Sequence, residues 1–537
     1  MIIMKRRFTY TFMLLIFQLR QKWLWLCLWL IGITTFASGY VSAFEKIAED
    51  QGKVGLFITM KNPAMAAIVG PLPVKSASQY SVGVMYGHEM TLFIAVITMI
   101  IAGSFMIDQT RKMEENGQLE ILKSLHIGSQ ASSMATNLLV LLHTVLTIIL
   151  VSGILVSYNV SSIDLKGSLY FACSLGLASL LGASIAYLCA QIFATSSQAR
   201  GIFFSIVGIL YVLRAGTDVS NLTLSKFNPL AWTYLGHPFY QNDWYYLIGL
   251  FLLTLVVFSI GLVLESSRDL GSSTIAPKKG KTKASKCLAT PLGFFFYLNR
   301  STIISWLLAD GVIALMYGSI YGDIDTFVSS NKLISQMFAN NSTTLINSFT
   351  SLIMVVTIAI GLVMPLVVVH KVQFETNKER LGYLLVQRVS RLKVYYSSLI
   401  LALFFGTLAI LINGFCLGIA ATSSMQANNG KFITTCIKAS LNQWPLVCLF
   451  VGLMLLSLSL PIFVGWLVYG LLGYSFCVTY FAVLLDLPKW MMHTSLFNVL
   501  AKMPMEKFDL MSFAILTGIG ILAMLLGGIL YTRKEIV

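Results

Sequence analysis

The chain has 537 residues, of which 57% are hydrophobic and only 11% are charged, and its mean hydropathy is +0.79. A soluble protein of this length uses far less apolar material in its core, so the composition excludes a soluble globular protein and predicts a membrane protein. The net charge of +15 does not call for nucleic acid, because basic loops that face anionic lipid are ordinary in membrane proteins. We therefore expect no nucleic-acid partner.

Twelve apolar stretches are long enough to cross a bilayer, which needs about 20 residues. They lie at about 23–43, 89–107, 135–157, 168–193, 201–216, 244–264, 301–320, 347–369, 394–420, 443–467, 468–486 and 510–531. The sequence thus predicts an all-α membrane protein with about twelve transmembrane helices. Residues 8–19 are expected to form an interfacial helix before the first span, since Arg20 and Lys22 divide the two.

The positive charges predict the orientation of the spans. With the N-terminus inside, the inner segments hold 24 of the 37 Lys and Arg residues, so both termini are expected in the cytoplasm.

The eight cysteines show no C-x-x-C spacing and no clustering with His. They indicate packing residues, and neither a metal site nor a disulfide framework.

A basic inner loop divides the chain into two halves. We predict a first six-helix half at 1–265, a cytoplasmic linker at 266–299 with Lys278, Lys279, Lys281, Lys283 and Lys286, and a second six-helix half at 300–537. Three landmarks recur in order. Residues 113–129, 227–231 and 268–270 match residues 375–391, 497–501 and 534–536, at offsets of 262, 270 and 266. Because each half has an even number of spans, the repeats are expected to be parallel.

The first of these landmarks is too polar to lie in lipid. At helical spacing, Leu119, Leu122 and Leu125 line one stripe, and Gly128 offers a C-terminal stop. In the second copy, Leu381 and Leu384 correspond to Leu119 and Leu122. We therefore predict a short surface helix at the cytoplasmic membrane face in each half.

Several segments resemble one known family. They are Arg111–Ser129 with its acidic–Gly–x–Leu–Glu–x–Leu pattern, Arg268-Asp-Leu-Gly271, Pro291-Leu-Gly293 through Arg300, and Leu485-Asp-Leu-Pro-Lys-Trp490. In these features the chain resembles ABC-2-type exporter permeases, and among them the fused two-half permeases often labelled exporters of polyketide antibiotics. The resemblance covers nearly the whole chain.

The resemblance implies a partner that supplies energy. In such permeases a separate cytoplasmic ABC ATPase, here expected in two copies, docks on the surface helices and binds ATP and Mg, while the permease is no enzyme and binds no cofactor. In agreement, the chain lacks the G-x-x-x-x-G-K-[ST] loop that holds phosphates. The residues implied in docking are Glu114, Glu115, Gly117, Leu119, Glu120 and Leu122 in the first half, and Glu375, Arg380, Leu381, Leu384 and Arg388 in the second.

The implied function is export of a hydrophobic or amphipathic compound, such as an antibiotic, a drug or a lipid-like molecule, across the plasma membrane of a prokaryote, with antibiotic resistance as one consequence. Membrane lipid is the other expected partner. Gly382 stands where the first half has Glu120, which leaves open whether the two ATPase contacts are equivalent. The identity of the substrate and the direction of transport also remain open.

Ionisable residues inside spans are candidates for the substrate path. Asp310 and His143 lie within spans, and for both a packing role is the competing interpretation. Glu89, after His88, lies at the outer end of the second span, where a solvated interface is the competing interpretation. Pro365 and Pro461 are expected to kink the eighth and tenth spans.

Two other classes of function were weighed. The alternative is a proton-coupled secondary multidrug transporter, which shares six-plus-six spans but needs buried carboxylates, of which only Asp310 lies deep. A membrane-embedded enzyme would need clustered catalytic residues, and no such set is visible in the sequence.

Overall fold

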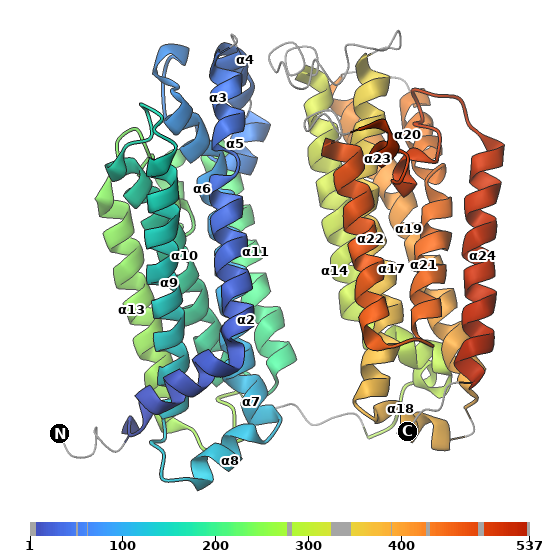
Figure 1. Cartoon of the computed structure of the whole chain (residues 1–537), viewed down its shortest axis with the longest axis horizontal. Coiled ribbons are helices and arrows are strands. Elements are labelled where there is room, and N and C mark those ends of the chain that lie inside the picture. The colour runs from blue at the N-terminus through green and yellow to red at the C-terminus, as the bar shows by residue number, and fades with distance from the viewer. Residues whose placement is uncertain are drawn as a thin grey trace. The chain divides into compact units, whose positions relative to one another are not determined.

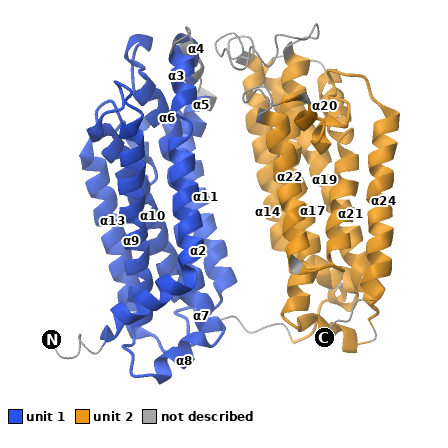
Figure 2. Cartoon of the chain, viewed as in Figure 1, with its two compact units in different colours: residues 1–280 blue, residues 281–537 orange. Residues whose placement is uncertain are grey.

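The computed structural model describes residues 7–49, 52–61, 63–275, 282–323, 345–387, 389–425, 430–481 and 488–533. The chain divides into two compact units, Met1–Gly280 and Lys281–Val537 (Figure 2). In the described ranges all regular elements are helices, and 12 of them are long and apolar enough to cross a membrane. The prediction of an all-α protein with many spans is confirmed.

Unit 1 contains six long helices and a set of short ones (Figure 1). The long helices are α2 (Thr11–Ser38), α6 (Val82–Gln109), α9 (Ala131–Ser157), α10 (Leu165–Ile192), α11 (Ser196–Ser220) and α13 (Trp244–Ser267). Between α2 and α6 the chain forms α3 (Val41–Glu49), α4 (Gly52–Met60), α5 (Pro63–Val69) and a 3-10 turn, η1 (Ala77–Gln79). Another pair of short elements, α12 (Leu222–Ser225) and η2 (Ala231–Thr233), lies between α11 and α13.

Unit 2 has the same order of long helices. They are α14 (Pro291–Ser319), α17 (Leu345–Asn377), α19 (Arg391–Ser424), the pair α20 (Lys431–Leu441) and α21 (Trp444–Ser457), then α22 (Ile462–Phe481) and α24 (Leu510–Arg533). Its short elements are η3 (Lys286–Ala289), η4 (Ile320–Asp323), α18 (Arg380–Val386), α23 (Lys489–Met492) and η5 (Leu496–Asn498).

The helices pair in the same way in both units. In each unit the first long helix packs on the third and the second packs on the fourth, and the fourth also packs on the third, fifth and sixth. In unit 1 these pairs centre on α10, and in unit 2 they centre on α21. The shared pairing supports an internal duplication of one six-helix fold.

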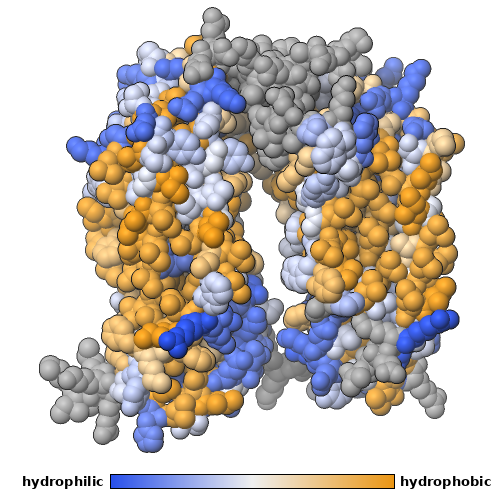
Figure 3. Space-filling view, in the orientation of Figure 1, coloured by the Kyte–Doolittle hydropathy of each residue, from blue (hydrophilic) through white to orange (hydrophobic). Residues whose placement is uncertain are grey.

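Local sequence signals begin several of these helices. The side chains of Asp164, Thr195 and Ser390 accept hydrogen bonds from backbone amides in the first turns of α10, α11 and α19. Thr290 caps α14 in the same way, and Pro291 occupies the first turn, where its missing amide hydrogen has no cost. Outward-facing apolar side chains then form a band around each unit, with hydrophilic residues at both ends (Figure 3).

Two expectations about helix boundaries differ from the structure. Residues 8–19 do not form a separate helix, because α2 runs without a break from Thr11 to Ser38, although its first turns run at an angle to the rest (Figure 1). Pro461 does not kink the tenth span: it separates α21 from α22, since proline is well accommodated at a helix start. Pro365 does lie inside a helix, α17.

Part of the expected linker is ordered against unit 1. The backbone amides of Thr274 and Ile275 donate to the carbonyl oxygens of Gln191 and Ile192, at 3.3 and 3.0 Å. Other parts of the predicted features lie outside the described residues. These are residues 278–281 of the basic loop, residues 485–487, the landmark at 534–536, and Arg388.

Candidate coupling site

The polar segment after the second span forms an elbow of two short helices, and not the single helix expected from the sequence. α6 ends at Gln109, α7 covers Arg111–Glu115, and α8 covers Gln118–Ser124 (Figure 1). Gly117 lies between α7 and α8 with φ +73°, a left-handed conformation that glycine adopts without steric cost. We call residues 110–125 the first elbow.

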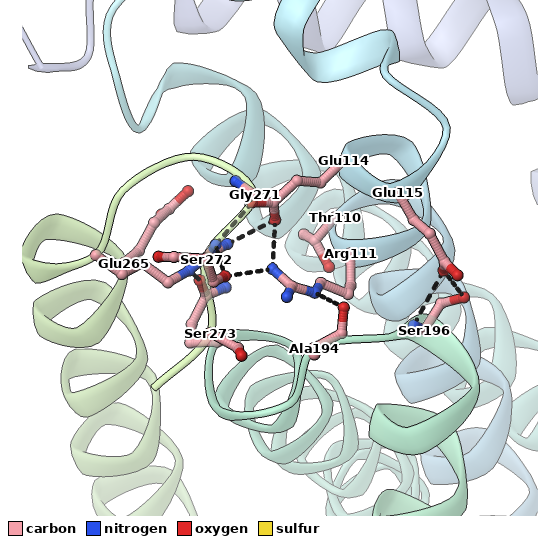
Figure 4. Close-up of polar contacts among 12 residues, drawn as sticks. Thr110, Arg111, Glu114, Glu115, Ala194, Ser196, Glu265, Gly271, Ser272 and Ser273 are labelled. Carbon is pink, nitrogen blue, oxygen red and sulfur yellow. Dashed lines mark hydrogen bonds and ion pairs between the residues drawn. The ribbon is translucent and has the colours of Figure 1, made fainter. Parts of the chain in front are cut away.

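Glu114 is the centre of the first elbow. Its carboxylate is buried and accepts hydrogen bonds from Arg111 at 2.9 Å, from both terminal nitrogens of Arg268 at 2.7 Å, and from the backbone amide of Gly271 at 2.7 Å. Figure 4 shows Glu114 directed at Arg111 and at the backbone of Gly271. Charge-assisted bonds of this kind are short and strong, and a bidentate pair with arginine also fixes the orientation.

The same cluster reaches two further parts of unit 1. Arg111 Nε donates to the carbonyl oxygen of Ala194, and the terminal nitrogens of Arg111 and Arg268 both donate to that of Ser272, at 2.9 to 3.0 Å. Arg268 Nε donates to Gln191 Oε1 at 2.7 Å. The first elbow is thus tied to the α10–α11 connection and to the chain leaving α13, so a displacement of α7 is passed to both.

Glu115 adds a second link to α11. Its Oε2 accepts hydrogen bonds from the backbone amide and hydroxyl of Ser196, at 3.1 and 2.5 Å, at the start of α11 (Figure 4). Glu114 and Glu115, both implied in ATPase docking, therefore hold the elbow to the rest of unit 1 in this structure.

Leu119 and Leu122, the two leucines of the stripe predicted for docking, face the protein. Leu119 is buried, and Leu122 packs with Leu14, Leu15 and Ile127 in a small cluster at the start of α2. The backbone amides of Gly128 and Gln130 donate to the carbonyl oxygens of Thr9 and Arg7, at 3.2 and 3.1 Å. These contacts fasten the elbow to the N-terminal segment.

The outward side of the first elbow carries Ile121 and also Leu125, the third leucine of the predicted stripe, because α8 ends at Ser124 and Leu125 is already extended. The side chains of Ile121 and Leu125 are 70% and 58% exposed, and Glu120 is exposed between Leu119 and Ile121. Two large aliphatic side chains in water at the end of a membrane helix are a candidate contact for another protein.

Unit 2 contains a matching second elbow, residues 378–387. Glu379 has φ +58°, and it lies 262 positions after Gly117, so the left-handed residue recurs at the offset of the sequence repeat. Leu381 is buried like Leu119, while Tyr383 and Val386 are 79% and 89% exposed. Leu384 is half-buried and packs against the unit core.

The charged residues of the second elbow are arranged differently. Glu375 lies 3.5 Å from Lys371 and 3.7 Å from Arg380, which itself is exposed. These distances are longer than those around Glu114, and within the described residues no hydrogen bond or ion pair ties Glu375 to a distant segment. The two elbows therefore share their backbone geometry and differ in how firmly they are held.

The candidates for the substrate path lie inside their own units. Asp310 is buried between α14, α17 and α19, where Asn413 Nδ2 donates to its Oδ1 at 3.3 Å. His143 is buried with its ring stacked on Trp29, at 3.8 Å between ring centroids. His143 belongs to unit 1 and Asp310 belongs to unit 2.

At the outer end of α6, His88 and Glu89 are not a solvated pair. His88 is buried, its Nε2 donates to the carbonyl oxygen of Gly70 at 3.1 Å, and its Nδ1 accepts from the Tyr80 hydroxyl at 2.9 Å. Glu89 is half-buried, and its Oε1 has no hydrogen-bond partner within the described residues.

Sequence reasoning missed one buried cluster, around Arg214 on α11. Arg214 is fully buried and donates to Asp218 at 3.2 Å, to the carbonyl oxygen of Ile68 at 3.0 Å, and to that of Ala67. Asp218 also accepts from the hydroxyl of Tyr234 at 2.5 Å, and burial raises the pKa of Tyr234, which keeps it a donor. An Arg and an Asp four positions apart inside a span were the available signal.

The comparisons with known proteins agree with this architecture. Residues 288–532 match the family model described as multidrug efflux system permease Rv1217c, C-terminal domain. The chain is 25% identical over 481 residues to the multidrug efflux system permease protein Rv1217c of Mycobacterium tuberculosis. The aligned region covers 87% of this chain and 86% of that protein. The resemblance to exporter permeases is confirmed. The chain is therefore a multi-pass membrane protein that is similar over most of its length to a multidrug efflux permease.

Proposed function

We propose that the chain is the membrane-spanning subunit of an ATP-driven exporter that moves hydrophobic or amphipathic compounds, drugs among them, out of a prokaryotic cell. A separate ABC ATPase in two copies binds ATP and Mg, and both termini of the permease lie in the cytoplasm. The similarity to a multidrug efflux permease supports export of drugs, and the distribution of Lys and Arg supports the orientation.

The observation that carries the proposal is the first elbow. It offers exposed apolar side chains to the aqueous side, while the buried bonds of Glu114 tie it to α11 and to the exit of α13. A partner that pushes on α8 therefore moves transmembrane helices, and does not merely bend a loop. ATP-driven closure of the two ATPases would convert this movement into a rigid-body rearrangement of the permease.

The exposure of side chains in the two elbows supports a narrower choice of docking residues. We place it on Ile121 and Leu125, with Glu120 beside them, and on Tyr383 and Val386 in the second elbow, since these side chains are exposed. Burial of apolar surface contributes about 25 cal/mol per Å². Leu119, Leu122, Leu381 and Leu384 support the elbows from within and do not touch the ATPase.

The test is co-purification of the permease with a candidate ABC ATPase. The double variant Ile121→Asp/Leu125→Asp is expected to lose the ATPase and the stimulation of its turnover, because two carboxylates would enter an apolar contact. The matched control is Leu222→Asp/Leu224→Asp, which changes two exposed residues, 47% and 53%, at the opposite end of unit 1.

Both double variants are checked for thermal stability in detergent, so that loss of the complex is separated from loss of the fold. A complex that survives Ile121→Asp/Leu125→Asp with full ATPase stimulation would refute this docking surface. Specific ATP binding by the purified permease alone would refute the separate ATPase.

A further inference from the structure

An open cavity of about 270 Å³ lies in unit 1 where α2 passes the end of α6 and the first elbow. From α2 it is lined by Gln21, Lys22 and Trp25. From the other side it is lined by Phe105, Asp108, Gln109, Lys112, Met113, Asn116 and Gln118. Phe105, Asp108, Gln109 and Lys112 fall at helical spacing, so one face of α6 and α7 is directed at one face of α2.

Most of the residues that line the cavity are polar, and two of them, Trp25 and Phe105, are aromatic. Seven of the ten lining residues are polar or charged, whereas pockets for drug-sized molecules are mainly apolar and span about 300–1,000 Å³. The rings of Trp25 and Phe105 stack at 4.8 Å between centroids. The size and the polarity therefore fit a small polar group with an apolar attachment, and not a whole hydrophobic drug.

The charge of the lining favours an anion. The carboxylate of Asp108 is already held by Lys112 and Arg200, each at 2.8 Å. Lys22 makes no ion pair or hydrogen bond with any described residue. The ammonium group of Lys22 is thus left without a counter-charge at the edge of the membrane. The second ammonium group of the lining, that of Lys112, shares the carboxylate of Asp108 with Arg200.

Apolar residues continue from the cavity along the outer surface of α2. The side chains of Leu24, Leu28 and Ile31 are more than half exposed. A ligand with a charged head in the cavity would find a hydrocarbon-facing surface for its tail on the same helix. Trp25 lies between the two regions, as amphipathic aromatic side chains do at membrane interfaces.

We propose that this cavity binds the phosphate-bearing headgroup of an anionic phospholipid of the inner leaflet. Lys22 and Lys112 face the phosphate, the amides of Gln21 and Gln118 lie around the polar headgroup, and the acyl chains lie along α2. Because Asn116 and Gln118 flank Gly117, a bound lipid touches the first elbow and restrains its hinge. This site depends on the orientation of unit 1 in the membrane and not on ATP-driven export.

The experiment uses the purified full-length chain without an ATPase. Native mass spectrometry measures binding of phosphatidylglycerol and of phosphatidylcholine with the same acyl chains. We expect preferential binding of phosphatidylglycerol, and a loss of about 30-fold in its affinity in Lys22→Gln/Lys112→Gln, since each lysine near a membrane surface contributes about 1 kcal/mol.

The control variant Lys166→Gln/Lys226→Gln removes the same charge at exposed positions at the opposite end of unit 1 and is expected to bind like the wild type. Glycerol phosphate, tested by calorimetry, separates the two sources of phosphate. Equal binding of the two lipids, or unchanged affinity in Lys22→Gln/Lys112→Gln, overturns the proposal. Glycerol phosphate binding as tight as that of the lipid overturns the lipid as ligand.

Discussion

At the scale of single residues, Glu114 joins two separate segments of unit 1, α7 and the chain that leaves α13. Its two oxygens accept from Arg111, Arg268 and Gly271, and the side chains of Glu114 and Arg111 are almost fully buried. Removal of one partner from a buried ion pair is costly because it leaves the other charge uncompensated. The first elbow is therefore expected to depend on Glu114 more than on any exposed residue.

We predict that Glu114→Ala lowers the stability of unit 1 by about 3–5 kcal/mol and uncouples ATP hydrolysis from transport. The double variant Glu114→Ala/Arg268→Ala should cost less than the sum of the two single changes, because the partners interact directly. Thermal unfolding in detergent and a double-mutant cycle measure this. The control Asp108→Asn, at a partly exposed ion pair, should cost about 0–1 kcal/mol; equal losses in both would contradict the prediction.

A second prediction at this scale concerns Asp310. Among the described residues its side chain accepts one hydrogen bond, from Asn413, and neighbours in the site such as Ile358, Leu362 and Val447 are apolar. Because a charge without a partner is expensive in such a place, the isosteric and neutral Asp310→Asn should keep both stability and transport. Efflux from vesicles checks this. Loss of transport in Asp310→Asn, with an intact fold, would favour the proton-coupled alternative.

At the scale of elements, each elbow contains one residue in the left-handed backbone conformation, but the residue type differs between the two elbows. The left-handed residue is Gly117 in the first elbow and Glu379 in the second. For a residue with a Cβ, this conformation costs about 1–2 kcal/mol. A Cβ at Gly117 would meet no atom within 4 Å, so the cost of a substitution there is one of backbone conformation and not of packing.

We therefore expect that replacing Gly117 and replacing Glu379 have opposite effects on the stability of their elbows. Gly117→Ala should destabilise the first elbow by about 1 kcal/mol, and Glu379→Gly should stabilise the second by a similar amount. Hydrogen exchange of residues 118–124 and 380–386 measures both. The control Gly382→Ala, inside α18 and also without a near neighbour for its Cβ, should increase protection. Faster exchange in Glu379→Gly would show that the strain argument fails.

At the scale of the whole molecule, the source of energy is the main prediction. We reconstitute the permease with its ATPase in vesicles and follow efflux of a hydrophobic dye. Efflux should continue with ATP and an uncoupler of the proton gradient, because the described spans contain few buried carboxylates that could carry protons, Asp310 foremost. A gradient without ATP should drive none. Efflux driven by the gradient alone would replace the exporter by a secondary transporter.

Much of the fold follows from the sequence. Spans are visible because each must satisfy its own backbone hydrogen bonds in lipid, and this makes long apolar helices the available solution. The repeat is visible for a similar reason, since both halves need a polar segment at the same place. The predicted span boundaries are wrong where the hydropathy is uniform along the chain. The boundary between α21 and α22 falls at Pro461, within a continuous apolar stretch, and hydropathy does not register it.

The candidate site depended on tertiary structure. The segments at Arg111 and Arg268 were both conspicuous in the sequence, but 154 positions separate Glu114 from Arg268, and no local pattern indicates that their side chains meet. The orientation of the elbow likewise depends on long-range contacts. Helical spacing shows that Leu119 and Leu122 share a face, but only the packing of Leu14 and Leu15 decides that this face turns inward and leaves Ile121 and Leu125 exposed. Periodicity thus fixes which residues lie together, and long-range contacts fix what they face.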